Sequence, residues 1–456
     1  MQKECCDILV IGGGPSGGVC ALTAKMNNPD KKIIILREHE KQLVPCSIPY
    51  VFGNTLGSVD NGIAPCGIPD GMDIEASVGT VKDIDVKNKI AYYNDIQLSF
   101  DKLVFATGST PFVHESLQHS LTLDGVFTVA KNVEHIRKLK DYAHSKQNIL
   151  IVGSGFIGIE IAMEFAEIGK NVTVVGGSEF ILNRAFDSDI AQKAQAIVEE
   201  AGVTYVGSDR VVEIVDKNGD NIVNAVKLKS GKIIDTDVVI LATGYKPNTA
   251  LAQKVGISLG HFGGIWVDDY MRTENQDIFA VGDCTARRGF ISKAPSRVML
   301  ASTSTAEARV AGSSIYGIKY LKGMSGTISI FSTKIGNTVF ASAGVTANKA
   351  EAKTNTSMII GSFEGMNRHP GKMPNTRKQY VKLIVSRYSG QIVGGQVIGG
   401  DEAGEIVNLI GNIIESGKSV YSVMSMQVAT QPMLTAAPTN YPLIMAAIMA
   451  IKEMES

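Results

Sequence analysis

The sequence predicts an α/β fold in which two dinucleotide-binding units are followed by an α+β C-terminal domain. Residues 7–11 form a short β-branched run that leads into the glycine-rich residues 12–17 and a helix-forming stretch. The same order of strand, glycine loop and helix recurs at residues 148–168. Past residue 323 the glycine loops stop and a different mixture of strands and helices begins. Because 456 residues exceed one typical core, two or three domains are expected.

The first unit carries the pattern G-x-G-x-x-G in the setting that this motif needs. Gly12, Gly14 and Gly17 stand between a predicted strand and a helix that runs to about residue 26. Unpaired N–H groups at such a helix start can hold a pyrophosphate. The next strand, residues 33–36, should be followed by an acidic residue that binds ribose hydroxyls. Arg37 intervenes, so we assign this role to Glu38 and leave a shift of register open.

A lone cysteine, Cys46, follows the second strand in the stretch Val-Pro-Cys-Ser-Ile-Pro-Tyr. The loop after this strand can approach a bound nucleotide, because ligands of doubly wound sheets lie beyond the carboxyl ends of the strands. Cys46 also stands at the start of a predicted short helix, whose dipole would lower the thiol pKa and favour the reactive thiolate. The alternative is a small buried hydrophobic residue. A second cysteine, Cys66, lies in the Gly/Pro-rich connection 53–71 and is interpreted as a loop or core thiol.

Later strands also end in residues suited to a cofactor. After a predicted hairpin at 78–86 and 90–98, strand 101–105 runs into Ala106, Thr107 and Gly108, where small residues allow close approach of the backbone and a hinge is expected. Strand 233–241 runs into a second Ala-Thr-Gly turn ending at Gly244. Strand 277–281 closes on Gly282 and Asp283, whose carboxylate can bind sugar hydroxyls or cap a helix. A helix at about 298–315 would present its N-terminus to the same cofactor.

The second unit repeats the fingerprint. A helix at 133–145 precedes strand 148–152, the loop 153–158, helix 159–168 and strand 171–175. Two fingerprints indicate two dinucleotides. The second strand ends in Gly176 and Gly177, so no carboxylate is there to repel a 2′-phosphate, and no arginine cluster is evident to attract one. The nucleotide preference is therefore open; Arg184 is near in sequence, but it is equally a surface arginine.

Composition bounds the remaining possibilities. A net charge of −1 gives no electrostatic case for binding nucleic acid or a membrane surface. The six cysteines are irregularly spaced, which suits a reducing compartment better than a disulfide framework, and we predict no metal site. The apolar runs at 8–11 and 442–451 are too short for a signal peptide or a membrane span. We expect a cytoplasmic protein. The tail should contain strands near 327–330, 338–345, 357–363, 380–386 and 391–398, then helices near 402–415 and 443–452.

Taken together, the motifs resemble, in their order, those of the FAD-dependent pyridine nucleotide–disulfide oxidoreductases. The second cysteine of the C-x4-C pair is missing after Cys46, so the chain resembles the single-cysteine branch, which includes coenzyme A disulfide reductases, NAD(P)H persulfide or polysulfide reductases and NADH oxidases. The resemblance implies an FAD domain at 1–112 and 243–322, an NAD(P)H domain at 113–242, and a dimerisation domain at 323–456. In the implied homodimer, this last domain completes the active site of the other subunit.

The resemblance also implies roles for individual residues. Cys46 would face the flavin as a thiolate and become a mixed disulfide, persulfide or sulfenic acid during turnover. Asp283 would hold the ribityl chain, whereas Ile157 and Glu160 would lie by the nicotinamide. The residues implied for FAD are Gly12, Gly14, Pro15, Ser16, Gly17, Glu38, Val81, Ala106, Thr107, Gly108, Gly244, Gly282 and Asp283. Those implied for NADH or NADPH are Gly153, Gly155, Phe156, Ile157, Gly158 and Glu160.

Three departures from the family pattern bear on the substrate. Water-forming oxidases and peroxidases resemble one another in a His within the first glycine loop, where this chain has Pro15. Coenzyme A disulfide reductases carry basic residues on the first helix, where this chain has Lys25 and then Met26. Gln431 replaces the general-base His of a Thr-His-Pro motif; as a candidate catalytic residue it can orient a substrate but cannot take a proton, and a structural role is equally open.

The leading hypothesis is therefore NAD(P)H-dependent reduction of a small disulfide, persulfide or polysulfide through Cys46, with coenzyme A as a possible partner. Two alternatives stay open. In one, oxygen takes the electrons and the protein is an NAD(P)H oxidase. In the other, Cys46 is uninvolved and the flavoprotein passes electrons to a small redox protein.

Overall fold

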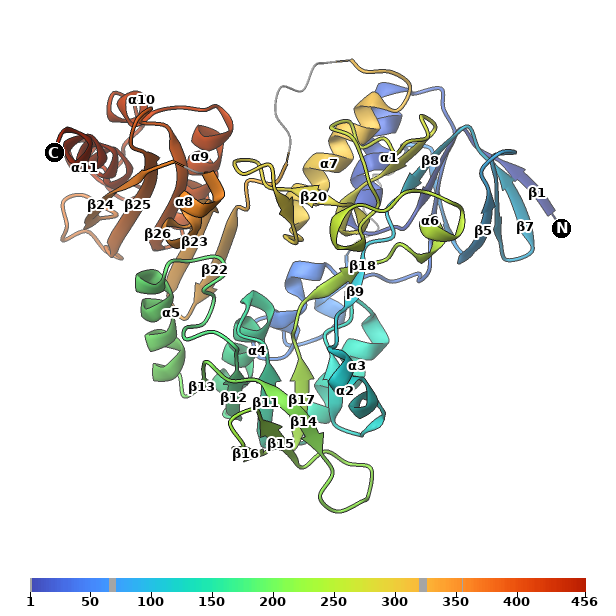
Figure 1. Ribbon diagram of the computed structural model, residues 1–456, viewed down its shortest axis with the longest axis horizontal. Coiled ribbons are helices and arrows are strands. Elements are labelled where there is room, and N and C mark those ends of the chain that lie inside the picture. Colours follow the sequence, from blue (N-terminus) through green and yellow to red (C-terminus); the bar gives the residue numbers. More distant parts are fainter. Residues whose placement is uncertain (1, 65–70, 320–325, 355) are drawn as a thin grey trace.

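The computed structural model describes residues 2–64, 71–319, 326–354 and 356–456 (Figure 1). Cys66 lies outside the described residues. The first unit is a five-stranded parallel sheet in the order β19-β8-β2-β3-β4. Its strands are β2 (Ile8–Ile11), β3 (Ile33–Arg37), β4 (Ile74–Val78), β8 (Lys102–Phe105) and β19 (Ile278–Ala280). The chain thus returns to this sheet after building the second unit.

Two layers cover the first sheet. Helices α1 (Pro15–Asn27) and α7 (Ala301–Ser314) pack together on one face, over Ile8, Val10 and Ile33. A four-stranded sheet covers the other face, over Leu9 and Ile34. This second sheet has the order β1 (Gln2–Cys5), β7 (Ile96–Ser99), β6 (Ile90–Tyr93), β5 (Val81–Asp85). Successive side chains of a strand point to opposite faces of its sheet. Both faces of this sheet are covered, so every residue of the apolar strand β2 is buried.

The second unit repeats this architecture. A parallel sheet in the order β10-β17-β11-β12-β13 carries helices on one face and a three-stranded antiparallel sheet on the other. Its strands are β10 (Val126–Thr128), β11 (Asn148–Val152), β12 (Asn171–Val175), β13 (Thr204–Val206) and β17 (Val238–Leu241). The helices on the first face are α3 (Val133–His144), α4 (Phe156–Glu167) and α5 (Ser188–Glu200). The small sheet on the other face is β14 (Val211–Val215), β15 (Ala225–Leu228) and β16 (Ile233–Asp235), and the short helix α2 (Glu115–Gln118) packs against it through Leu117.

Two short strands connect the units. β9 (Ser109–Pro111) pairs antiparallel with β18 (Tyr245–Pro247), where the chain passes from the first unit to the second and back. The return is followed by α6 (Ala250–Lys254) and the two-residue strands β20 (Arg287–Arg288) and β21 (Pro295–Ser296). One segment crosses over: Leu43, Val51 and Phe52, which follow β3, are buried in the helical core of the second unit.

The C-terminal unit is an antiparallel sheet in the order β22-β23-β26-β25-β24, at the opposite end of the molecule from the N-terminus (Figure 1). Its strands are β22 (Phe331–Ile335), β23 (Thr338–Gly344), β24 (Met358–Met366), β25 (Lys378–Ser386) and β26 (Ile392–Gly399). Its helices are α8 (Ala347–Thr354), α9 (Ala403–Glu415), α10 (Val420–Met424) and α11 (Pro442–Glu455). No helix within the described ranges is long and apolar enough to cross a membrane.

A buried polar cluster fastens the second unit to the C-terminal unit. Asp187, just before α5, forms an ion pair with Lys382 of β25 at 3.0 Å and accepts a hydrogen bond from Gln396 of β26 at 2.6 Å. The N–H groups of Ala347 and Asn348 also donate to its carboxylate at 3.1 Å. Asp187, Lys382 and Gln396 are buried, so the charges are satisfied by one another and not by water.

Most predicted elements are confirmed, with differences of a few residues at their ends, but three expectations were wrong. The strand expected at 327–330 is β22, which begins at Phe331. The strand expected at 90–98 is two strands, because Asn94 and Asp95 adopt left-handed turn conformations with φ of 42° and 62°. The strand expected at 233–241 is also two strands, β16 and β17, which belong to different sheets.

Candidate active site

The first glycine loop has the form that a pyrophosphate requires. Gly12 has φ of 112°, and a Cβ there would lie 2.2 Å from the carbonyl oxygen of Ala106. A Cβ on Gly17 would lie 1.9 Å from the carbonyl oxygen of Gly12, so loop and helix are in backbone contact. Gly14 precedes α1, which has no side-chain cap and Pro15 in its first turn, and space around it is open. The free N–H groups at this helix start can therefore receive an anion.

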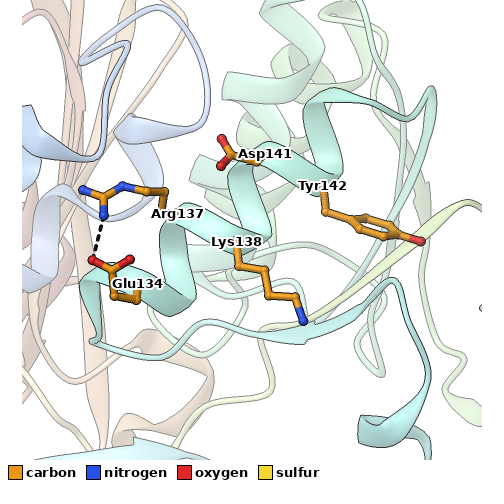
Figure 2. Close-up of a pocket in the computed structure, with 5 residues that line it drawn as sticks. All are labelled: Glu134, Arg137, Lys138, Asp141 and Tyr142. Atoms are coloured by element: carbon orange, nitrogen blue, oxygen red, sulfur yellow. Dashed lines mark hydrogen bonds and ion pairs between the residues drawn. The ribbon is translucent and has the colours of Figure 1, made fainter.

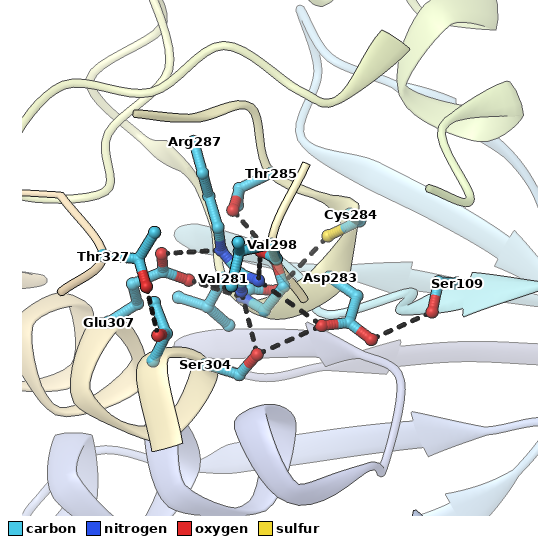
Figure 3. Close-up of polar contacts among 12 residues, drawn as sticks. Ser109, Val281, Asp283, Cys284, Thr285, Arg287, Val298, Ser304, Glu307 and Thr327 are labelled. Carbon is cyan, nitrogen blue, oxygen red and sulfur yellow. Dashed lines mark hydrogen bonds and ion pairs between the residues drawn. The ribbon is translucent and has the colours of Figure 1, made fainter. Parts of the chain in front are cut away.

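Asp283 lies near this loop in a network of polar side chains (Figure 3). Its carboxylate accepts hydrogen bonds from Ser109 at 2.9 Å and Ser304 at 3.3 Å, and forms an ion pair with Lys131 at 2.9 Å. Burial alone would raise the pKa of this carboxyl, but Lys131 and Arg287 hold it below its usual range. Gly282 brings the backbone against Ser16, whose Oγ would lie 2.4 Å from a Cβ at residue 282. The Asp283 carboxylate, next to the backbone of Gly282, can therefore accept hydrogen bonds from the hydroxyl groups of a sugar.

The other predicted residues of the first site occupy strand ends. Thr107 donates to the carbonyl oxygen of Asn248 at 2.6 Å, which holds the turn at residues 106–108 against β18. Gly108 and Gly244 have φ of 68° and 104°. Val81 is buried at the start of β5, and Glu38 is exposed just after β3. These positions fit a flavin dinucleotide at the carboxyl end of the sheet; their individual roles stay predictions.

The second glycine loop repeats the first. Gly153 has φ of 119°, and a Cβ there would lie 2.4 Å from the carbonyl oxygen of Ala242. A Cβ on Gly158 would lie 2.0 Å from the carbonyl oxygen of Gly153. Gly155 precedes α4 and has open space around it. Phe156, the first residue of α4, stacks on Phe331 of β22 with ring centroids 5.3 Å apart, so the C-terminal unit borders this helix start. Ile157 follows Phe156 in the first turn.

Cys46 lies in a single three-residue 3₁₀ turn, Pro45–Ser47, and is exposed. The lowered thiol pKa expected from a helix dipole is not found, since one such turn aligns too few peptide dipoles. Partial desolvation of the sulfur instead raises the pKa of the Cys46 thiol, and the negative charge of Glu160 raises it further, whereas Lys131 acts in the opposite direction. The chain alone therefore favours the thiol form.

Glu160 on α4 is the acidic residue that faces Cys46. Its carboxylate accepts hydrogen bonds from Thr333 of β22 at 2.8 Å and from Tyr50, four residues after Cys46. Burial raises the pKa of Glu160 to about 7, which these two hydrogen bonds only partly offset. Burial and Glu160 raise the pKa of Tyr50, so Tyr50 stays protonated and acts as the hydrogen-bond donor. A carboxyl poised near neutrality beside a thiol is suited to exchange a proton with it.

A second glutamate explains why Cys46 lies beside α4. Glu164, one turn further along α4, is buried and accepts hydrogen bonds from the N–H of Gly53 at 3.1 Å and the hydroxyl of Thr55 at 2.5 Å. His144 bonds the carbonyl oxygen of Phe52 at 2.7 Å, and the Phe52 and Phe165 rings are 5.4 Å apart. Contacts between residues about a hundred positions apart thus fix the cysteine segment on the second unit.

Tyr50, Lys131 and Thr333 complete the site without having been predicted. Tyr50 lies four residues after Cys46, and this closeness in sequence could have suggested that it belongs to the site. Lys131 lies between β10 and α3, and Thr333 lies on β22, which was placed too early in the chain. Neither carries a motif, because each contact depends on how separate units pack.

Gln431 is not brought to Cys46 by any contact recorded for the described chain. Its side-chain oxygen accepts the N–H of Met433 at 2.7 Å, and its own N–H donates to Thr435 at 2.9 Å. These two hydrogen bonds stabilise the loop in which Gln431 lies. Lys25 is buried, and it donates to the carbonyl oxygen of Lys31 at 2.9 Å and to Asp73 at 3.1 Å. It is therefore a structural residue of the first unit.

A hollow on the outer face of α3 is of another kind (Figure 2). It is lined by Glu134, Arg137, Lys138, Asp141 and Tyr142. Arg137 pairs with Glu134 at 2.6 Å and also with Asp60 at 3.0 Å. None of its lining residues is a thiol or belongs to a glycine loop, so we assign this surface hollow no role in catalysis. Within the described ranges, no group of three or more His, Cys, Asp and Glu side chains could hold a metal ion.

Two glycine cradles, a cysteine between them and a third unit closing the site define a flavin-dependent oxidoreductase that takes hydride from a nicotinamide nucleotide. Comparison with known sequences gives the family. The chain belongs to the pyridine nucleotide-disulphide oxidoreductases: the family model matches residues 6–308, and the model of the family's dimerisation domain matches residues 330–441. It is thus an NAD(P)H-dependent FAD enzyme.

Its relatives carry two kinds of name. It is 30% identical to an NADH oxidase of Methanocaldococcus jannaschii over 98% of this chain and 99% of that protein. It is also 30% identical to an NAD(P)H coenzyme A polysulfide/persulfide reductase of Pyrococcus horikoshii, over 88% of each chain. Among solved structures, an NAD-dependent persulfide reductase from A. fulgidus matches with a TM-score of 0.89 and 26% identity, covering 98% of this chain and 84% of that one.

Proposed function

We propose that this enzyme uses NAD(P)H to reduce a sulfur–sulfur bond in a small disulfide, persulfide or polysulfide, and that Cys46 is the sulfur that exchanges with the substrate. One observation carries the proposal: the exposed Cys46 thiol is subject to the charges of Glu160, Lys131 and Asp283, which come from three separate parts of the chain. An accessible thiol at the junction of the two glycine-loop units is placed to receive electrons. The sulfur-reducing relatives support this assignment.

The chemistry assigns a proton to each step. Cys46 transfers its proton to the Glu160 carboxylate, and the thiolate attacks one sulfur of the substrate R–S–S–R′. A Cys46–S–R mixed disulfide forms, the substrate S–S bond breaks, and R′S⁻ takes the proton from Glu160 and leaves as R′SH. FAD, when bound, supplies the two electrons delivered by the nicotinamide as hydride, which return Cys46 to the thiol and release RSH. The balance is NAD(P)H + H⁺ + RSSR′ giving NAD(P)⁺ + RSH + R′SH.

The chain's own residues hold and enclose the reactants. Gly12, Gly14 and Gly17 would hold the FAD pyrophosphate and Asp283 its ribityl hydroxyls, on the evidence of the first cradle. Tyr50 and Thr333 orient the Glu160 carboxylate toward the thiol. The division into an FAD domain at 1–112 and 243–322, an NAD(P)H domain at 113–242 and a dimerisation domain at 323–456 stays part of this proposal. So do a homodimer, in which Gln431 would act on the partner's site, and a cytoplasmic location.

Oxygen is the second candidate acceptor, because the relative from M. jannaschii is named an NADH oxidase. Pro15 occupies the loop position where water-forming oxidases resemble one another in a His, which counts against peroxide chemistry here. Coenzyme A is the candidate thiol partner, from the name of the P. horikoshii relative. Since Lys25 is engaged with Asp73, the phosphates of coenzyme A would have to be held by other residues.

The decisive experiment is an anaerobic titration with NADH and NADPH, followed by flavin absorbance. We expect the wild type to take up about one more two-electron equivalent than Cys46→Ser once Cys46 is oxidised by substrate. Cys5→Ser, which removes another exposed cysteine, is the matched control and should titrate as wild type. If Cys46→Ser titrates as wild type and still reduces disulfides and persulfides, Cys46 is structural. Turnover with air that survives in Cys46→Ser would favour oxygen or a protein acceptor.

A further inference from the structure

The end of β12 is where a nucleotide enzyme of this fold distinguishes NADH from NADPH, through the residues that face the adenine ribose. Here that position is Gly176. A Cβ on Gly176 would lie 2.5 Å from Oγ of Ser154 and 2.6 Å from the hydroxyl oxygen of Tyr205. Tyr205 is fixed by donating to the carbonyl oxygen of Ser178 at 2.7 Å. The carboxylate that would bind a ribose 2′-hydroxyl and repel a 2′-phosphate is therefore excluded by packing.

A cation stands beside the next residue. A Cβ on Gly177 would lie 3.2 Å from Nε of Arg210, 3.7 Å from its Cγ and 3.9 Å from its Cζ, so the arginine side chain lies along the bare backbone of Gly177. Arg210 immediately precedes β14 and reaches the β12 end from a different part of the sequence. This is why no arginine cluster was evident beside residues 176 and 177.

The guanidinium of Arg210 is available. Arg210 is exposed, and no hydrogen bond or ion pair joins its guanidinium to any residue that the structure describes. The neighbouring carboxylate of Asp209 is engaged by the hydroxyl and N–H of Ser230 and by the backbone N–H of Arg210 at 2.8 Å. Burial lowers the pKa of Lys349 of α8, and the charges of Lys353 and Arg184 lower it further, so Arg184, the nearer arginine in sequence, lies instead near α8.

We propose that Arg210 selects NADPH over NADH by pairing with the 2′-phosphate of the adenine ribose. A planar guanidinium binds phosphate through two parallel hydrogen bonds, which a 2′-hydroxyl cannot reproduce. The inference rests on the proposed NAD(P)H-dependent function, but it concerns only the nucleotide step. Gly177 has no side chain that would stand between Arg210 and a phosphate at the end of β12.

The test measures nucleotide binding to the oxidised holoenzyme by calorimetry, without any sulfur substrate. The probes are adenosine 2′,5′-bisphosphate and adenosine 5′-monophosphate, which differ only in the 2′-phosphate. Arg210→Gln should weaken binding of the bisphosphate roughly 10- to 100-fold and change binding of the monophosphate by less than about twofold. Arg210→Lys, which keeps the charge but loses the paired hydrogen bonds, should fall between. Arg184→Gln is the matched control and should bind both probes as wild type.

A second variant and a rate measurement complete the design. Gly177→Asp places a carboxylate against Arg210 and should also abolish the preference for the bisphosphate. Anaerobic flavin reduction should be faster at limiting NADPH than at limiting NADH in the wild type, and Arg210→Gln should remove the difference. Equal binding of both probes by the wild type, or loss of the preference in Arg184→Gln but not in Arg210→Gln, overturns the proposal. Failure of sulfur reduction would leave these results unaffected, so the two proposals fail separately.

Discussion

Glu160→Gln tests the electrostatics of the site through the pH dependence of stability. The pKa of Glu160 is raised from 4.5 to about 7 because its carboxylate is buried. The folded protein therefore binds this proton more tightly than the unfolded chain does. The resulting contribution to stability is full below the unfolded pKa of 4.5 and is lost as the pH rises through the folded pKa of about 7. The amide side chain of the Glu160→Gln variant would accept the same hydrogen bonds from Thr333 and Tyr50 without titrating.

The magnitude follows from the two pKa values. At about 1.4 kcal/mol per pKa unit, the interval from 4.5 to about 7 corresponds to about 3 kcal/mol. Between about pH 5 and 8, wild type should lose up to this much stability relative to Glu160→Gln. If all 456 residues unfold as one unit, this is a relative fall in Tm of about 3 °C.

Calorimetric scans of the holoenzyme without nicotinamide, at several pH values, would measure this difference. Glu200→Gln, at the exposed end of α5, is the matched control, and its Tm should stay parallel to that of wild type. A constant difference in Tm between Glu160→Gln and wild type from about pH 5 to 8 would refute the reasoning, because it would mean that Glu160 titrates alike in the folded and unfolded states.

Two further predictions concern the flavin cradle and the junction between units. Gly12→Ala should lose flavin, because its Cβ would lie 2.2 Å from a carbonyl oxygen, whereas Gly18→Ala, with open space, should keep it; a normal ratio of flavin to protein absorbance in Gly12→Ala would contradict this. Lys382→Met should cost about 3–5 kcal/mol by leaving the buried Asp187 carboxylate without a cation. Lys334→Met, which breaks an exposed pair with Asp401, should leave the free energy of unfolding in denaturant nearly unchanged; equal losses in the two variants would contradict the argument.

The parts predicted from sequence are those that depend on neighbours along the chain. The strand, glycine loop and helix from Ile8 to Asn27 are one continuous local signal, and its repetition at Asn148–Glu167 identified the second unit. The same local reasoning missed α5, because a helix of Ala, Gln and Glu after the loop 176–187 carries no motif. It also misplaced β22, since the apolar residues at 328 and 330 pack on the C-terminal core without belonging to a strand.

Site chemistry was predicted only where one segment contains it. Cys46 and Glu160 each lie in a recognisable stretch, but their facing arrangement depends on Glu164 holding Gly53 across 111 positions. The pKa of Cys46 was predicted in the wrong direction, because the sign depends on desolvation and on the charge of Glu160, which only packing reveals. Arg210 was invisible beside Gly177 for the same reason.

The ion pair between Asp187 and Lys382 limits how this enzyme can be recombined with its relatives. A chimaera that imports only the nicotinamide-binding unit brings its own side chain to the position of Asp187, while Lys382 and Gln396 stay behind in the C-terminal sheet. Because Lys382 also pairs with Asp189 at 3.0 Å, its buried ammonium is left without a counter-ion when the imported side chains at positions 187 and 189 are both apolar. A graft of this unit should therefore carry β25 and β26 together with α5.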